Sequence, residues 1–236
     1  IDGLGQNFKP IGDSVHAFVG VFDGKKHTIR NLQIGNEKRD FSGFFGYAQN
    51  AVIQNLKLMN VKVTGCWFVG AMAGSTKNSV VTNVISLNGD VEGESFVGGL
   101  IGEAVGGNIA IVATTGNIKG DDYIGGVVGD LSASINDAFS INVIKGYEYV
   151  GGVFGYVESY APIVRRVYSA SMIKAPDGRG LAASALYVAV DPSTGFFDGT
   201  VAQVESGGLP TASMLKQETY STYDFDAVWE IQEDIS

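Results

Sequence analysis

The chain has 236 residues, of which 45% are hydrophobic and 17% charged, and this composition excludes an intrinsically disordered protein. Its net charge of −9 and its isoelectric point near 4.6 argue against a nucleic-acid partner, because nucleic-acid-binding proteins carry basic patches or stripes. No run of about 18 apolar residues occurs, so we expect no membrane-spanning segment, and the single cysteine, Cys66, leaves no internal disulfide.

The first 40 residues predict irregular coils that precede a regular array. Residues 1–17 contain Pro10 and glycine turns, residues 18–36 form a further coil, and a charged loop follows at residues 37–40. The chain begins at Ile1 without a methionine and within an apparent strand. We therefore expect it to be a fragment of a longer precursor.

From residue 41 onward the chain repeats a six-residue glycine-rich phrase, of which Val97-Gly98-Gly99-Leu100-Ile101-Gly102 is a clear copy. The copies occupy residues 41–46, 69–74, 97–102, 124–129 and 150–155. Their closing glycines lie at positions 46, 74, 102, 129 and 155, so the steps are 28, 28, 27 and 26 residues. A fixed period of this length is the signature of a solenoid, in which each repeat stacks on the next one.

Each period also contains two further short segments with the alternation of a β-strand. One contains an Asn, as in Ile53-Gln54-Asn55-Leu56, and the other places a β-branched residue between polar neighbours, as in Lys62-Val63-Thr64. Three strands and three corners in about 27 residues predict one coil of a parallel β-helix, with about eight coils in the chain. An amphipathic α-helix is excluded, because no apolar stripe persists at a spacing of about 3.6 residues.

Equivalent residues of successive coils should stack into ladders along the axis. We expect an inward aliphatic stack, an aromatic stack just before the phrase, an outward polar row and an Asn ladder. The inward aliphatic stack consists of Val63, Val91, Ile118, Ile144 and Ile173, and the aromatic stack consists of Phe68, Phe96, Tyr123 and Tyr149. The outward polar row consists of Thr64, Glu92, Lys119, Lys145 and Lys174. The Asn ladder consists of Asn31, Asn55 and Asn83. The glycines that follow the third strands, Gly93, Gly120 and Gly146, are predicted to take a positive φ at a sharp corner.

The repeat pattern weakens after Ile173, and a cap is expected at the C-terminal end. In this cap Thr211 is predicted to N-cap a short helix, and the strand Val228-Trp229-Glu230-Ile231 is predicted to pair with the last coil. The whole chain, residues 1–236, is thus expected to be a single β-helix domain that consists of irregular coils (1–40), regular repeats (41–174), degenerate coils with a looped insertion (175–208) and the cap (209–236).

The repeated phrase resembles the core of the GLUG-motif repeat family of bacterial extracellular proteins. The run from Phe18 to Leu32 resembles the lead-in of such proteins, and the tail from Met214 to Ile231 resembles their closing segment, so the resemblance spans nearly the whole chain. It implies a right-handed parallel β-helix in a secreted or cell-surface protein, commonly an adhesin-like one. Repeats of this family also occur beside the catalytic part of some bacterial immunoglobulin A proteases.

Two mixed clusters of charged residues are candidates for a catalytic centre. One combines Asp23 with the basic run 25–27, and the other combines Arg165-Arg166 with Glu158. Both fit the solvated edge of a coil, and no nucleophile motif with a histidine base occurs in the sequence. We therefore expect no catalytic residues. The alternative, a polysaccharide-acting β-helix lyase or glycosidase, would require clustered carboxylates in a cleft that crosses the sheet.

Four corner residues form the predicted ligand-binding site. Trp67 comes just before the aromatic stack, and Glu94, Asp122 and Glu148 lie on later corners. An aromatic ring beside carboxylates suits a glycan or a protein partner from the host or matrix. Ca²⁺ is the alternative ligand of these carboxylates, but the Gly-Gly-x-Gly-x-Asp repeat of calcium-binding β-rolls is missing, so we expect no cofactor and leave metal binding open.

Together, these patterns predict a non-catalytic β-helix module of a secreted or cell-surface bacterial protein that acts in adhesion, display or spacing. The alternatives from other classes are the polysaccharide-acting enzyme and an accessory domain of a surface protease.

Overall fold

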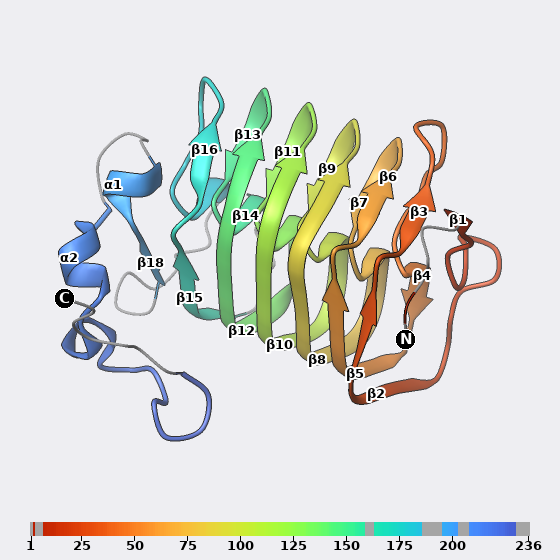
Figure 1. Ribbon diagram of the computed structural model, residues 1–236, viewed down its shortest axis with the longest axis horizontal. Coiled ribbons are helices and arrows are strands. Elements are labelled where there is room, and N and C mark those ends of the chain that lie inside the picture. The colour runs from red at the N-terminus through yellow and green to blue at the C-terminus, as the bar shows by residue number, and fades with distance from the viewer. Residues whose placement is uncertain (1, 3–6, 159–162, 186–194, 203–207, 230–236) are drawn as a thin grey trace.

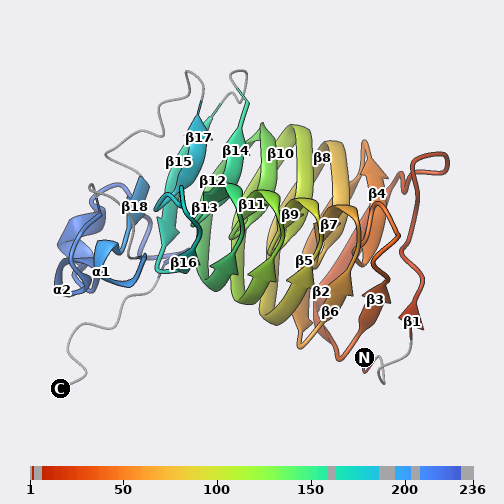
Figure 2. The same ribbon diagram turned by 90° about the horizontal axis from the view of Figure 1, so that it is seen from above.

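The structure, a computed structural model, describes residue 2 and residues 7–158, 163–185, 195–202 and 208–229. It is a parallel β-solenoid of about six turns with almost no helix, which confirms the predicted fold class. Figure 1 shows the coils stacked along the long axis, from the red N-terminal strands to the blue helices at the other end, and Figure 2 shows this stack from above. The turns are fewer than the eight expected, because the described residues after position 174 form short separate elements rather than complete regular coils.

Two parallel sheets form the described solenoid. The large sheet has fourteen strands and the main order β1-β3-β6-β8-β10-β12-β14-β17. Its strands are β1 (Asn7–Phe8), β2 (Val21–Arg30), β3 (Gln33–Gly35), β4 (Phe45–Gln49), β5 (Val52–Met59), β6 (Lys62–Thr64), β8 (Ala73–Glu92), β10 (Ile101–Lys119), β12 (Val128–Lys145), β14 (Phe154–Val157), β15 (Val164–Ser169), β16 (Met172–Lys174), β17 (Ala182–Ala185) and β18 (Gly195–Phe197). The small sheet has the order β13-β11-β9-β7 and consists of β7 (Trp67–Gly70), β9 (Ser95–Gly98), β11 (Asp122–Gly125) and β13 (Glu148–Gly151).

The predicted inward aliphatic stack is confirmed. Its members are Cα partners on successive coils and are each at most 6% exposed: Val63, Val91, Ile118, Ile144 and Ile173. The outward polar row follows the same register, and Lys119 forms an ion pair with Glu92 there. Both side chains of this pair are exposed, so it contributes under about 1 kcal/mol, whereas the inward stack supplies the apolar burial of the core.

The predicted aromatic stack is also confirmed, and it includes a further ring, Phe41. The centroids of neighbouring rings lie 4.8–4.9 Å apart with interplanar angles of 13–15°, through Phe41, Phe68, Phe96, Tyr123 and Tyr149. All of these residues have a positive φ between 51° and 58°. Such a backbone is uncommon for bulky residues, so the sharp corner of each coil is made by an aromatic residue that its stacked neighbours hold in place.

Replacement of Phe96 should reveal this unusual backbone. Phe96→Ala is expected to destabilise the module by roughly 2 kcal/mol, because it removes two stacked ring contacts of a partly buried side chain. Since φ at this position is 56°, Phe96→Gly should be less destabilising than Phe96→Ala by about 0.5–1 kcal/mol, the reverse of the usual order in a strand. Urea denaturation measures both variants, and a Gly variant weaker than the Ala variant would contradict the positive φ.

The predicted positive φ of Gly93, Gly120 and Gly146 is wrong. None of the three lies in the left-handed region, and each instead packs against the first side chain of a phrase. A Cβ at Gly93 would lie 2.7 Å from Val69 Cγ2, and a Cβ at Gly120 would lie 2.4 Å from Ile124 Cδ1. Glycine is required here because there is no room for a side chain.

In the last three copies of the phrase the third position is glycine, because the opposite wall of the coil comes very close. A Cβ there would lie 3.2 Å from Thr114 Cβ at Gly99, 2.0 Å from Ser140 Oγ at Gly126, and 2.4 Å from Ser169 Oγ at Gly152. The facing side chains are small, buried and polar, and they are hydrogen-bonded: Thr114 Oγ1 donates to the carbonyl oxygen of Gly126 at 2.6 Å. The glycine and the hydroxyl residue opposite it thus form one matched unit in each of these three coils.

The predicted Asn ladder is divided between two corners. Asn83 Nδ2 donates to Asn55 Oδ1 at 2.8 Å, as expected for a ladder. Asn31 instead belongs to a second ladder, in which the amides of Asn60 and Asn88 donate in turn at 3.3 and 3.4 Å. All of these Asn residues have a positive φ between 53° and 59°, which Asn tolerates better than most residues. The coils that contain these residues therefore have two left-handed corners that carry Asn. The sequence pattern did not distinguish the two corners from each other.

The C-terminal segment differs from the predicted cap. Its helices are short: α1 (Gly199–Ala202), α2 (Thr211–Met214) and the 3₁₀ helix η1 (Gln217–Tyr220). The N-cap of α2 is Pro210, without a side-chain hydrogen bond, so the predicted capping by Thr211 is wrong. None of the described helices is long and apolar enough to cross a membrane.

This segment covers the solenoid with side chains rather than with an added strand. Val228 and Trp229 are not in a strand, and the other two residues of the predicted strand, 230–231, lie outside the described residues. The ring of Trp229 lies 5.9 Å from that of Phe139 on β12, and the ring of Tyr220 lies 6.1 Å from that of Tyr168 on β15. At the described positions 228–229 the predicted strand is thus absent, and aromatic rings pack on the outer face of the coils.

Candidate functional site

The small sheet brings three of the four predicted ligand-binding residues into one row. Trp67 pairs with Ser95, Ser95 with Asp122, and Asp122 with Glu148, on β7, β9, β11 and β13. Trp67 is 50% exposed, and the side chain of Glu148 is exposed as well. Neighbouring strands lie about 4.8 Å apart. This Trp67 row therefore presents an indole, a hydroxyl and two carboxylates along one corner of the solenoid.

The fourth predicted residue, Glu94, lies in the neighbouring row with Cys66 and Asp121. Its backbone N–H donates to the carbonyl oxygen of Cys66, and the N–H of Asp121 donates to the carbonyl oxygen of Glu94, both at 2.8 Å. Cys66 Sγ donates to Glu94 Oε2 at 3.3 Å. This hydrogen bond, together with burial and the charges of Glu94 and Asp40, raises the pKa of Cys66 to about 11. The thiol is therefore protonated at neutral pH and is not an activated nucleophile.

The aromatic residues of this corner differ in how much of their surface a ligand can reach. The rings of the aromatic stack cover one another, because they are nearly parallel and 4.8–4.9 Å apart. Trp67 and Tyr147 take part in none of the ring contacts found among the described residues, and they are 50% and 64% exposed. These two side chains therefore offer isolated aromatic surface to a partner, and Tyr149, at the end of the stack, is 38% exposed as well.

Within the described residues, the Trp67 row holds no metal cluster and lies outside the surface hollow found near the N-terminal end. Among the described residues, no three His, Cys, Asp or Glu side chains are grouped so that they would hold a metal ion. A surface hollow of about 430 Å³ lies elsewhere, between β1, β3 and β6, and includes Glu37, Lys38 and Lys62. The Trp67 row is therefore not part of this hollow, and Ca²⁺ binding there stays a prediction.

Asp23, from the first mixed cluster, is held in structural contacts. Its Oδ1 accepts from the backbone N–H of Lys25 at 2.8 Å and from Asn55 Nδ2 at 3.0 Å, and its Oδ2 accepts from Gln54 Nε2 at 3.2 Å. These bonds, that of the Lys25 N–H first, lower the pKa of Asp23. They hold the bulge between Asp23 and His27 on β2. The carboxylate thus has a structural role that the sequence did not indicate.

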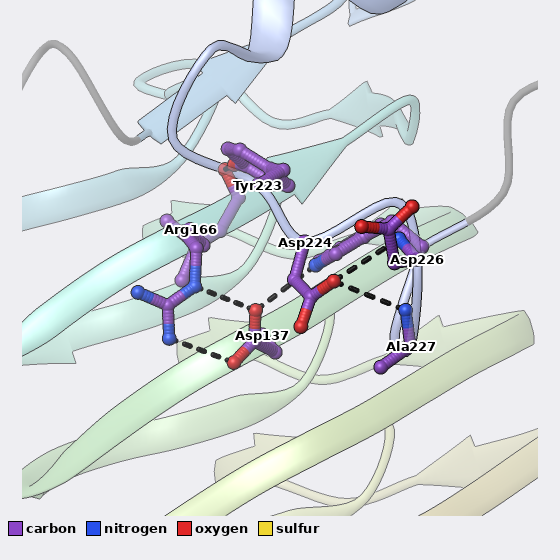
Figure 3. A network of polar contacts seen from close by, with 8 residues as sticks. Asp137, Arg166, Tyr223, Asp224, Asp226 and Ala227 are labelled. Carbon is purple, nitrogen blue, oxygen red and sulfur yellow. Dashed lines mark hydrogen bonds and ion pairs between the residues drawn. The ribbon is translucent and has the colours of Figure 1, made fainter.

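Arg166, from the second mixed cluster, is part of a partly buried network under the C-terminal segment. Arg166 Nε and Nη2 donate to the two oxygens of Asp137 at 2.7 and 2.8 Å, and Trp229 Nε1 donates to Asp137 Oδ1 at 2.9 Å (Figure 3). Tyr223, from the same segment, donates its hydroxyl to the carbonyl oxygen of Val167 at 3.0 Å. Burial opposes ionisation of Asp137, but the bonds from Arg166 and Trp229 outweigh it and lower its pKa.

A row of polar residues that the sequence analysis did not single out follows the closing glycines of the phrases. It contains Tyr47, Ser75, Glu103, Asp130 and Tyr156, which are Cα partners from coil to coil. Ser75 Oγ donates to Glu103 Oε2 at 2.7 Å, whereas Asp130 Oδ1 is buried and has no hydrogen-bond partner. Burial, followed by the charges of Glu158 and Glu103, raises the pKa of Asp130 to about 7. Aligning the repeats on their closing glycines would have identified this row.

Comparison with known proteins gives one partial similarity. The chain is 42% identical over 76 residues to Halomucin from Haloquadratum walsbyi, and the match covers 30% of this chain but 1% of that protein. The chain thus spans only about 1% of the length of the relative that it matches. No family model matches the chain, and no solved structure matches it.

Proposed function

We propose that the chain is a non-catalytic β-solenoid module of a secreted or cell-surface bacterial protein, which binds a glycan or a protein through the Trp67 row. The observation that carries the proposal is that a half-exposed indole stands in register with Ser95, Asp122 and Glu148 on a regular sheet. Membership of the GLUG-motif family is part of this proposal. The partial similarity to Halomucin is compatible with it.

The geometry suits weak, repeated recognition rather than tight binding. An indole supplies rigid apolar surface at little cost in conformational entropy, and the carboxylates of Asp122 and Glu148 accept hydrogen bonds from hydroxyl or amine groups of a ligand. The surface is shallow and buries little area, so each contact should bind weakly. Several copies of such a module, or several ligand units along one chain, would raise the overall affinity.

Binding should depend on Trp67 and Asp122 together. We expect a glycan-array or calorimetric signal of the parent module to fall at least about 10-fold in Trp67→Ala and to disappear in Trp67→Ala combined with Asp122→Ala, because ring stacking and a charged acceptor are both removed. Tyr147→Ala is the matched control, since it removes an exposed ring outside the Trp67 row. Binding that survives the double substitution would place the site elsewhere.

The polysaccharide-acting enzyme is the second candidate, and one observation favours it. Glu103 and Asp130 are acidic residues in register on neighbouring strands, and burial raises the pKa of Asp130 to about 7, which suits a general acid beside a second carboxylate. Incubation with acidic and neutral polysaccharides, followed by assays for reducing ends and unsaturated products, decides between the two. Turnover that Glu103→Gln abolishes would overturn the non-catalytic proposal.

A further inference from the structure

Glu103 and Asp130 are neighbouring acidic residues on successive coils. The two residues are Cα partners on β10 and β12, and paired strands lie about 4.8 Å apart. Glu103 Oε2 already accepts the hydroxyl proton of Ser75, whereas Asp130 Oδ1 is shielded from solvent and accepts nothing. A buried polar atom without a hydrogen-bond partner lowers the stability of the folded state, and a proton or a cation bound to this oxygen would remove that cost.

Among the described residues, the ionisable groups next to Asp130 are acidic, and none of them is a cation. They are the carboxylates of Glu103 and Glu158 and the phenols of Tyr123 and Tyr156, from β10, β11, β14 and the residue after β14. Asp122 and Tyr149 lie one step further away, beside Tyr123. Tyr47, on β4, lies beside Glu103. The ion pairs found in the described part of the chain involve other carboxylates, namely those of Asp13, Asp90, Glu92, Asp137 and Glu218.

Two ionised carboxylates in such a place repel each other, and one of them would also lack its hydration. A proton on Asp130 removes both costs at once. It converts the partnerless oxygen into a hydroxyl that can donate a hydrogen bond, and it leaves only one negative charge in the pair.

We propose that Glu103 and Asp130 share one proton in the folded module, as a hydrogen-bonded acid pair between β10 and β12, so that the solenoid is more stable in mildly acidic than in alkaline solution. The contact between these two central coils would thus contribute to stability in a pH-dependent way. This inference is independent of the Trp67 row and of any ligand.

The direction of the pH dependence follows from the raised pKa. The pKa of Asp130 is about 7 in the folded chain and about 3.9 in an unfolded one, so the folded state holds the extra proton between these values. Stability therefore falls as pH rises from about 4 to about 7 and is constant above that range as far as this group is concerned. The lowered pKa of Asp137 acts in the opposite direction and below this window, and that of Cys66, about 11, lies above it.

The test is the melting temperature of the full chain between pH 4.5 and pH 8.5 at constant ionic strength, with EDTA present. The parent should lose roughly 5–10 °C over this range. Asp130→Asn, which keeps the shape and a hydrogen-bond donor, should lose this slope and exceed the parent above pH 7. Asp122→Asn is the matched control and should keep the slope of the parent. In Glu103→Gln the midpoint should move to lower pH, because the neighbouring charge is gone.

The proposal would be overturned if the melting temperature of the parent did not fall with pH, or if it still fell with pH in Asp130→Asn. If the pH midpoint of this fall were unchanged in Glu103→Gln, Glu103 would not share the proton with Asp130. Carboxyl ¹³C NMR of aspartate-labelled protein gives a direct second readout: one resonance should titrate near pH 7 and be missing in Asp130→Asn. If Ca²⁺ instead of EDTA removes the slope of the parent at high pH but has no effect on Asp130→Asn, a cation rather than a proton neutralises the pair, and the proposal is wrong.

Discussion

Gly126→Ala is expected to destabilise the module by about 3 kcal/mol or more, or to prevent its folding. The new Cβ would lie 2.0 Å from the carbonyl oxygen of Gly152 and 2.0 Å from Ser140 Oγ. Ser140 cannot move aside easily, because it is buried and bonded to Asn142 Nδ2 and Ser171 Oγ, both at 2.7 Å. Overpacking of a rigid interior typically costs about 1–3 kcal/mol, and here a backbone atom must move as well.

The measurement is equilibrium unfolding in urea, with Gly89→Ala as the matched control. A Cβ at Gly89 would lie 3.2 Å from Ser86 Oγ, and the next nearest atoms, Thr115 O and Val91 Cγ2, would both be 3.9 Å away. This substitution should therefore change the free energy of unfolding by less than about 1 kcal/mol. Gly126→Ala combined with Ser140→Gly should recover part of the loss, because the facing side chain is then absent. Equal effects of Gly89→Ala and Gly126→Ala would show that the phrase glycines are not required by close packing.

The register of the solenoid could be predicted from the sequence, because the glycines that fix it recur at a nearly constant step. The partners of Ile118 and the stacking of Phe96 on Tyr123 follow from that step alone. The reason for each glycine could not be predicted in the same way. Gly120 was expected to turn the chain, but the turn is made by Tyr123, with φ of 58°, and only the packing against Ile124 shows why Gly120 has no side chain.

The candidate site was predictable in part. Counted from the corner glycines, Trp67 and Asp122 occupy the same place in the repeat, whereas Glu94 comes one residue earlier, so the sequence itself separates Glu94 from the Trp67 row. The burial of Asp130 was not accessible from the sequence, because it depends on which neighbours cover the carboxyl group. The contact between Asp137 and Trp229 spans 92 residues and lies outside the repeat, so no periodicity could indicate it.

Loss of the contact between Asp137 and Trp229 is expected to release the C-terminal segment from the solenoid. Asp137→Ala is expected to lower the free energy of unfolding by roughly 2–4 kcal/mol, because Arg166 and the indole N–H of Trp229 both lose their acceptor in a partly buried place. In a Trp67→Phe background, Trp229 is the single tryptophan and reports on its own environment. Its fluorescence should shift to longer wavelength in Asp137→Ala, and the segment that follows Leu209 should become sensitive to protease.

The same network sets a lower pH limit for docking of this segment. The pKa of Asp137 is lowered in the folded chain, so its contribution is present above an unfolded value of about 3.9 and is lost as pH falls through the lower folded value. The Trp229 signal of the parent should therefore stay constant from neutral pH to about pH 4 and change below it. Asn136→Ala, at the neighbouring position of β12, is the control and should leave fluorescence and protease resistance unchanged. If Asp137→Ala gives the same spectrum and cleavage pattern as this control, aromatic packing on Phe139 and Tyr168 holds the segment without the ion pair.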